Sequence, residues 1–156
     1  MNTKMNRLPV PTWNHLGVNF APAAAALPQV PADGWGTANA TAAVPAGMRT
    51  NGPASEIFDT FAESGMGMAA DAFLAANANV KGHIAVGEGA AIETPAVLEV
   101  KLDEAHPYAL SYLTIDAAKN SALTVVQVLR GDAENGVAAS LVRINAAEGA
   151  HVKLVQ

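Results

Sequence analysis

The sequence contains no cysteine. This absence excludes a disulfide framework, thiolate zinc sites, iron–sulfur clusters ligated by Cys, and Cys nucleophiles. A chain without Cys suits the reducing cytoplasm, so a cytoplasmic location is expected.

Charge, aromatic residues and long apolar runs are also scarce. Charged residues make up 15% of the 156 residues, and the formal net charge is -5. Binding to nucleic acid or to an anionic membrane needs clustered Lys and Arg, so neither partner is expected. The run Ala23–Leu27 is far shorter than the roughly 20 residues that span a bilayer.

Alanine dominates what is present, with 34 residues, while aromatic residues are only 5%. The length of 156 residues predicts one domain of ordinary size. The composition predicts a thin core made mostly of Val, Ile, Leu and Ala.

Composition divides the chain into three zones. Residues 1–54 hold most of the prolines and are expected to form an N-terminal arm and linker, irregular from Ala21 to Gly52. Trp13 is its candidate docking anchor, although a local cap packed on the same domain is an alternative. Residues 55–79 begin at the N-cap candidate Ser55 and predict two short helices, which end near Asn77 and Asn79.

Residues 80–156 alternate between apolar and polar residues and are rich in β-branched types. This pattern predicts strands over 97–102, 110–115, 123–129, 138–144 and 152–155.

The third zone repeats itself. Ile115–Gln127 aligns without a gap on Ile144–Gln156 at an offset of 29, with five identities in thirteen positions. A weaker copy, Glu88–Glu93, aligns on Lys119–Thr124 at an offset of 31. Each copy has a tight turn at a residue type that tolerates positive φ, namely Gly89, Asn120 and Gly149.

A fixed repeat of this length is typical of a stacked solenoid, and units made only of strands predict a β-helix. The expected fold is therefore mainly β, with β-helix rungs preceded by a small helical and irregular N-terminal region. The alternative is a plain β-sandwich whose hairpins resemble one another by chance.

The second copy stops at Gln156 in mid-strand, which leaves a last rung without a polar cap. One reading is that the chain is truncated, as the front part of a longer protein. The other is that the open rung pairs with a second copy, through an interaction edge at Leu141, Ile144, Val152 and Leu154.

No active site is predicted. The four histidines, His15, His83, His106 and His151, lack the spacing of a zinc site, so no metal or cofactor ligand is assigned. The carboxylates are scattered, and Ser64 lies in a segment without the full nucleophile-elbow pattern. A small metal-dependent enzyme is the least favoured hypothesis, and no catalytic residue is assigned.

Three segments resemble the SufB/SufD family, in particular its SufD-like members. Residues 7–19, RLPVPTWNHLGVN, look like the start of the shorter SufD-like chains. Residues 84–95 resemble the segment of the family that enters the β-helix, and residues 142–152 resemble a strand followed by its Glu-Gly-Ala turn.

The resemblance implies a right-handed parallel β-helix and a non-catalytic scaffold role in SUF-type iron–sulfur cluster assembly. It implies two partners, a SufB-like subunit and a SufC-like ATPase, with the cluster handled transiently by the full complex. The family's functional His and its ATPase-docking helices lie in a C-terminal part that has no counterpart in this sequence. No family site residue is therefore transferred to a position here.

Overall fold

The computed structural model describes residues 4–5, 21–22, 36–50, 68–134 and 136–156, and within them the protein is mainly β. Two short strands, β1 (Lys4–Met5) and β2 (Ala21–Pro22), pair antiparallel. The remaining elements are β3 (Asn39–Ala43), β4 (Met48–Arg49), α3 (Met68–Asn77), β5 (Val80–Val86), β6 (Ala96–Leu102), β7 (Tyr108–Ala117), β8 (Ala122–Gly131), β9 (Val137–Ala146) and β10 (His151–Val155).

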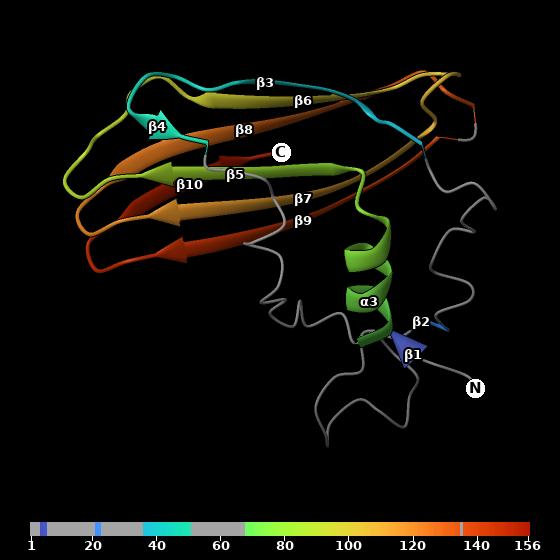
Figure 1. Cartoon of the computed structure of the whole chain (residues 1–156), viewed down its shortest axis with the longest axis horizontal. Coiled ribbons are helices and arrows are strands. Elements are labelled where there is room, and N and C mark those ends of the chain that lie inside the picture. The colour runs from blue at the N-terminus through green and yellow to red at the C-terminus, as the bar shows by residue number, and fades with distance from the viewer. Residues whose placement is uncertain (1–3, 6–20, 23–35, 51–67, 135) are drawn as a thin grey trace.

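From β5 onward, consecutive strands alternate between two four-stranded sheets (Figure 1). One sheet has the order β4-β5-β7-β9 and the other has the order β10-β8-β6-β3. The pairs among β5 to β10 are parallel, whereas β3 and β4 join their sheets antiparallel. Consecutive strands therefore do not form the hairpins of the sandwich alternative. The two mixed sheets do not close on each other, and the expected mainly β class is confirmed at this level.

The sequence repeat coincides with the pairing register. Ile115 on β7 lies beside Ile144 on β9, and Ala122 on β8 lies beside His151 on β10, each at the offset of 29. The offset of 31 brings Ala91 into a parallel bridge with Ala122. Residues aligned by sequence are thus neighbours in space. All five predicted strands are present, each extended by one or two residues at one or both ends.

The three turns between the sheets stack on one another. Gly89, Asn120 and Gly149 have φ values of 69°, 56° and 69°, which confirms their predicted left-handed conformation. The amide of Gly89 donates to Lys119 O at 2.9 Å, and the amide of Asn120 donates to Glu148 O at 3.0 Å. These bonds continue the register of the strands through the turns.

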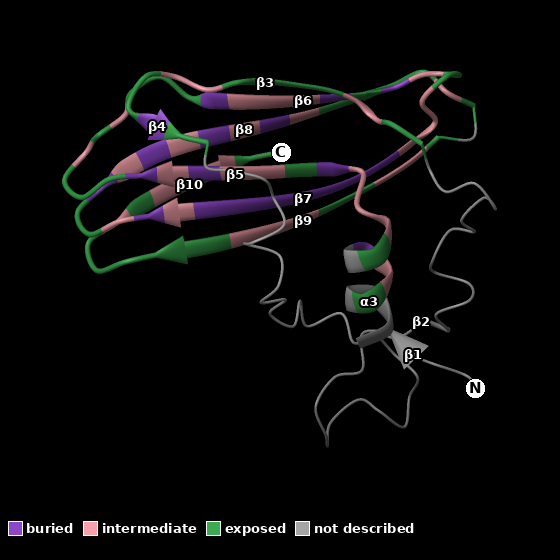
Figure 2. Cartoon of the chain, viewed as in Figure 1, coloured by how far each residue is buried: buried purple, intermediate pink, exposed green. Residues whose placement is uncertain are grey.

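The core lies between the two sheets and consists of apolar side chains at alternating positions (Figure 2). Its fully or nearly fully buried members include Ile84, Leu113, Ile115, Leu123 and Val125. The predicted core composition, mostly Val, Ile, Leu and Ala, is confirmed for this cluster, which also includes Met48.

Helix α3 packs outside the core, where Leu74 contacts Leu110 of β7. The helix ends where the sequence predicted, because the Asn77 side chain donates to Phe73 O at 2.8 Å and the next element starts at Val80. Asn79 then joins the helix to the sheet, since its Oδ1 accepts from the Leu110 amide at 2.8 Å. The first of the two predicted helices lies outside the described residues.

The irregular chain predicted for 21–52 is wrong at three places, 21–22, 39–43 and 48–49. Residues Asn39–Ala43 form β3, which pairs along β6, and Met48–Arg49 form β4, which pairs with Ala85 and Val86. The segment Asn-Ala-Thr-Ala-Ala has one β-branched residue and little intrinsic strand preference. The edge of β6 supplies the backbone partners that fix its conformation.

Candidate functional site

The outermost strands β9 and β10 form the candidate site. Within the part of the chain that the structure describes, each has a strand partner on one side only, β7 for β9 and β8 for β10. None of their residues falls in the buried class. Strand edges of this kind present backbone donors and acceptors that can pair with a further strand.

The predicted interaction edge divides between two faces. Val152 and Leu154 pack against the main core between the sheets, and Ile144 is the register partner of the buried Ile115. Leu141 lies elsewhere, because it packs with Leu74 and Leu110 on the side of the sheet that carries α3. Leu141 therefore does not share a face with the other three, and the interaction edge itself stays a prediction. Odd and even positions of a strand point to opposite faces, so Leu141 cannot share a face with Ile144.

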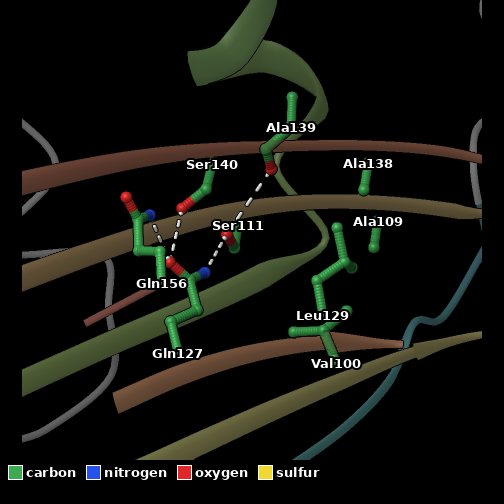
Figure 3. Close-up of a pocket in the computed structure, with 9 residues that line it drawn as sticks. All are labelled: Val100, Ala109, Ser111, Gln127, Leu129, Ala138, Ala139, Ser140 and Gln156. Carbon is green, nitrogen blue, oxygen red and sulfur yellow. Dashed lines mark hydrogen bonds between the residues drawn. The ribbon is translucent and has the colours of Figure 1, made fainter. Parts of the chain in front are cut away.

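A polar cluster lies between the sheets beside these strands (Figure 3). We call Ser111, Gln127, Ser140 and Gln156 the Gln/Ser cluster. The Gln127 side-chain amide donates to Ser111 Oγ at 2.9 Å, and its Oε1 accepts from Ser140 Oγ at 3.0 Å and from Gln156 Nε2 at 2.9 Å. Ser111 Oγ also donates to Ala139 O at 3.4 Å.

The cluster borders a cavity of about 290 Å³, whose other lining residues are Val100, Ala109, Leu129, Ala138 and Ala139 (Figure 3). The lining carries no ionisable side chain. Such a site can form hydrogen bonds and apolar contacts. Ser111 and Ser140 bring hydroxyl groups to it, but its lining holds no ionisable side chain that could act as a base beside them.

The Gln/Ser cluster is not among the predicted sites, although the sequence carries a signal for it. Gln127 and Gln156 are one of the five identities in the alignment at an offset of 29, and Ser111 and Ser140 are separated by the same offset. Identical polar pairs at the repeat offset therefore indicate the cluster.

A second polar group lies on the face of the β4-β5-β7-β9 sheet. With its proton on Nε2, His83 donates to Asp116 Oδ2 across 2.6 Å, and the side chain of Asn145 donates to Asp116 Oδ1 at 2.6 Å. The His83 side chain is 8% exposed. Its Nδ1 and the hydroxyl of Thr114 are buried without a hydrogen-bond partner in the described structure.

His106 belongs to a third group, which joins β3 to the turn after β6. Its Nδ1 lies 2.9 Å from Asp103 Oδ1, and Asn39 of β3 donates to Asp103 Oδ2 at 3.1 Å. The hydrogen bond from Asn39, followed by that from His106, lowers the pKa of Asp103 to about 2.

Three residues that the sequence analysis singled out remain. His151 is exposed at the start of β10, whereas His15 and Trp13 lie outside the described residues. Among the described residues, no three His, Cys, Asp or Glu side chains are placed to hold one metal ion. No helix in the described ranges has the length and apolar character needed to cross a membrane.

Comparison of the chain with protein-family models, curated proteins and solved structures found no match.

Proposed function

We propose that this chain is a non-catalytic scaffold module of a SUF-type iron–sulfur cluster assembly complex, similar to SufD. Its partners are a SufB-like subunit and a SufC-like ATPase, and it acts in the cytoplasm. The iron–sulfur cluster is the cargo of the complex, and this chain contributes no catalytic residue or resident cofactor of its own.

The observation that carries the proposal is the coincidence of the sequence repeat with parallel strand register. The β7–β9 pair and the β8–β10 pair have the same offset of 29 residues, as stacked rungs of a β-helix require. The alternation of successive strands between the two sheets supports the same reading. We therefore interpret β5 to β10 as successive rungs of the right-handed β-helix that the SufD resemblance implies.

The placement of the family-like segments adds support. Residues 84–95 run from the end of β5 to the start of β6, and residues 142–152 run from β9 into β10. Both segments thus contain the stacked turns at Gly89 and Gly149, where a family-specific turn sequence is most constrained.

The proposal is tested by tagging the endogenous protein at its N-terminus in its source cells and purifying it under native conditions. We expect mass spectrometry to identify a SufB-like subunit and a SufC-like ATPase, with both recovered above an untagged control strain. The intact mass of the tagged chain is measured in the same sample, because the ATPase-docking part of the family lies C-terminal to the segments matched here. Recovery of neither partner, with a chain of any mass, contradicts the SUF assignment.

A second candidate function is a free-standing β-solenoid that dimerises through β9 and β10. Ile144 is 42% exposed although its register partner Ile115 is fully buried, so this inward-facing position on β9 lacks a cover in the described structure. A second copy that paired with these strands would bury Ile144 and satisfy both edges.

Sedimentation velocity distinguishes this candidate. We expect a dimer for the parent chain and dissociation for Ile144→Lys, because a charge would then be buried in the contact. Val155→Lys is the matched control, since Val155 is 40% exposed but points away from the core. A monomeric parent chain, or equal effects of the two variants, rules out pairing through this end.

A further inference from the structure

The apolar pattern of the stacked strands leaves their register incompletely determined. On β8 the inward positions are Leu123, Val125 and Gln127, and Val152 and Leu154 of β10 lie beside the first two. A shift by one residue would turn every inward side chain outward, so the hydrophobic pattern forbids it. A shift by two residues keeps apolar side chains inside, and the pattern alone does not forbid that.

The Gln/Ser cluster distinguishes these alternatives. In the observed register Gln127 accepts from Gln156 and Ser140, and it donates to Ser111 across the core. A two-residue shift of β10 would instead put Leu154 beside Gln127 and remove Gln156 from reach. Gln127 is only 8% exposed, so a lost partner leaves a buried amide unsatisfied, which is strongly unfavourable.

The β4-β5-β7-β9 sheet also has a polar pair among its inward positions, beside Gln127. Ser111 of β7 lies beside Ser140 of β9. The inward positions before and after this pair are apolar, and they could still pack side by side after a shift. A two-residue shift of β9 would place Ser140 beside Leu113 or Ala109 and break its bond to Gln127. Because Gln127 bonds to both serines, the registers of the two sheets are coupled to each other.

We propose that the Gln/Ser cluster is the register determinant of β7 to β10: it selects the 29-residue register from those that the apolar pattern permits. Buried polar groups are known to fix register at some cost in stability. The inference is independent of the proposed function, because it concerns only how the described strands choose their neighbours.

The first pair of strands shows that the cluster is a local device. Leu98 of β6 lies beside Gln127, and Val80 of β5 lies beside Ser111, so the same rows are apolar there. In that region β3 runs antiparallel along β6 and supplies a separate constraint on position.

Engineered disulfides can read the register, because the chain has no cysteine of its own. Thr124 and Lys153 are register partners on the outward face, so Thr124→Cys with Lys153→Cys reports the observed register. Val126→Cys with Lys153→Cys reports the register shifted by two. Parallel neighbours lie about 4.8 Å apart and the diagonal pair about 8 Å apart, and the latter exceeds the reach of a disulfide.

The test variant is Gln127→Leu with Gln156→Leu, made in both Cys backgrounds of the full chain. Ser140 is exposed in the described structure, and Ser111 keeps the Ala139 carbonyl as an acceptor, so the core tolerates the change. We expect the parent chain to cross-link only at the first pair. In the double Leu variant, the ratio of first-pair to second-pair cross-linking should fall roughly ten-fold or more.

Two further variants separate register choice from loss of stability. Val125→Ala weakens the same strand without touching the cluster, and it should cross-link only at the first pair. Leu154→Gln with Gln156→Leu moves the glutamine that bonds to Gln127 by two residues along the chain. This variant should cross-link at the second pair instead of the first. The proposal is wrong if Leu154→Gln with Gln156→Leu still cross-links at the first pair, or if Gln127→Leu with Gln156→Leu does so. It is also wrong if Val125→Ala cross-links at both pairs, as the double Leu variant is expected to do.

Discussion

The first and last strand pairs of the stack lie in the same rows but have different surroundings. Strands β5 and β6 are covered by β4 and β3, and they bury Ile84, Val86, Ala96 and Val100 almost completely. Strands β9 and β10 occupy equivalent rows, yet no residue in either falls in the buried class. Burial along the repeat is therefore set by neighbouring strands more than by residue type.

This difference predicts a gradient of local stability along the stack. In repeat architectures each unit is stabilised mainly by contacts with its neighbours, so a unit with one neighbour opens more readily than a unit with two. The polar cluster lies on the less buried side, where hydrophobic burial contributes least to fixing the strands.

The largest test of the gradient compares two isoleucines in one register row. Ile115 is fully buried and Ile144 is 42% exposed. We expect Ile115→Ala to lower the free energy of unfolding by roughly 2–5 kcal/mol, because it leaves a cavity in a packed core. Ile144→Ala should cost less than about 1 kcal/mol, since much of its surface is already in water. Urea unfolding of each full-length variant measures both values.

Similar costs for the two substitutions would break the comparison. Ile144 would then be covered in solution by something that pairs with β9. Repeating the measurement across a range of protein concentrations identifies a second copy as the cover, because only that cover makes the cost concentration-dependent.

Two glycines in equivalent turns give a smaller and sharper comparison. Gly89 and Gly149 both have φ of 69°, a conformation that costs an L-residue with a side chain about 1 kcal/mol. A Cβ on Gly89 would meet nothing nearby, whereas a Cβ on Gly149 would meet the side-chain oxygen of Asn120. In thermal unfolding, the melting temperature should be lower for Gly89→Ala than for the parent chain, and somewhat lower still for Gly149→Ala.

A second background tests whether Asn120 causes the larger destabilisation by Gly149→Ala. In an Asn120→Gly background the obstructing oxygen is gone, and Gly149→Ala should then cost no more than Gly89→Ala. If the excess persists, contact with Asn120 is not its cause.

These turns also show how much of the fold could be predicted from the sequence. The β-branched alternation over 123–129 and the Gly or Asn at each turn are local signals, and the strands and positive φ values that they predict were found. The offset of 29 even predicted which residues would be neighbours, because stacking converts sequence periodicity into contact.

Other features depend on partners that no local pattern specifies. Asn39–Ala43 became a strand because it lies along β6, more than fifty residues later in the chain. His83 meets Asp116 because the 31-residue offset places His83 beside Thr114, two residues before the aspartate on the same face. The alternation of a strand separates Leu141 from Ile144, but that Leu141 packs beside Leu74 of α3 depends on the fold.

The smallest expected effect concerns the contact that holds β3 against the first strand pair. Because the pKa of Asp103 is lowered from its ordinary value of 3.8 to about 2, its carboxylate is favoured in the folded state. The stabilisation is fully present above about pH 4, and it is lost as the pH falls towards 2. We expect the melting temperature of the parent chain to decline through this window, partly because of Asp103.

Asn39→Ala isolates that part, since the hydrogen bond from Asn39 is the largest cause of the lowered pKa. The variant should melt below the parent chain at pH 5, and the difference should shrink as the pH falls towards 2, because the Asp103 carboxylate becomes progressively protonated in the parent chain. Asp103→Asn should show the same convergence. A constant difference between Asn39→Ala and the parent from pH 5 to pH 2 would mean that the contact stabilises β3 without any dependence on charge. Hydrogen exchange at β6 would report loss of the β3 pairing. Exchange in β9 and β10 should stay unchanged, because among the described strands β3 pairs with β6 alone.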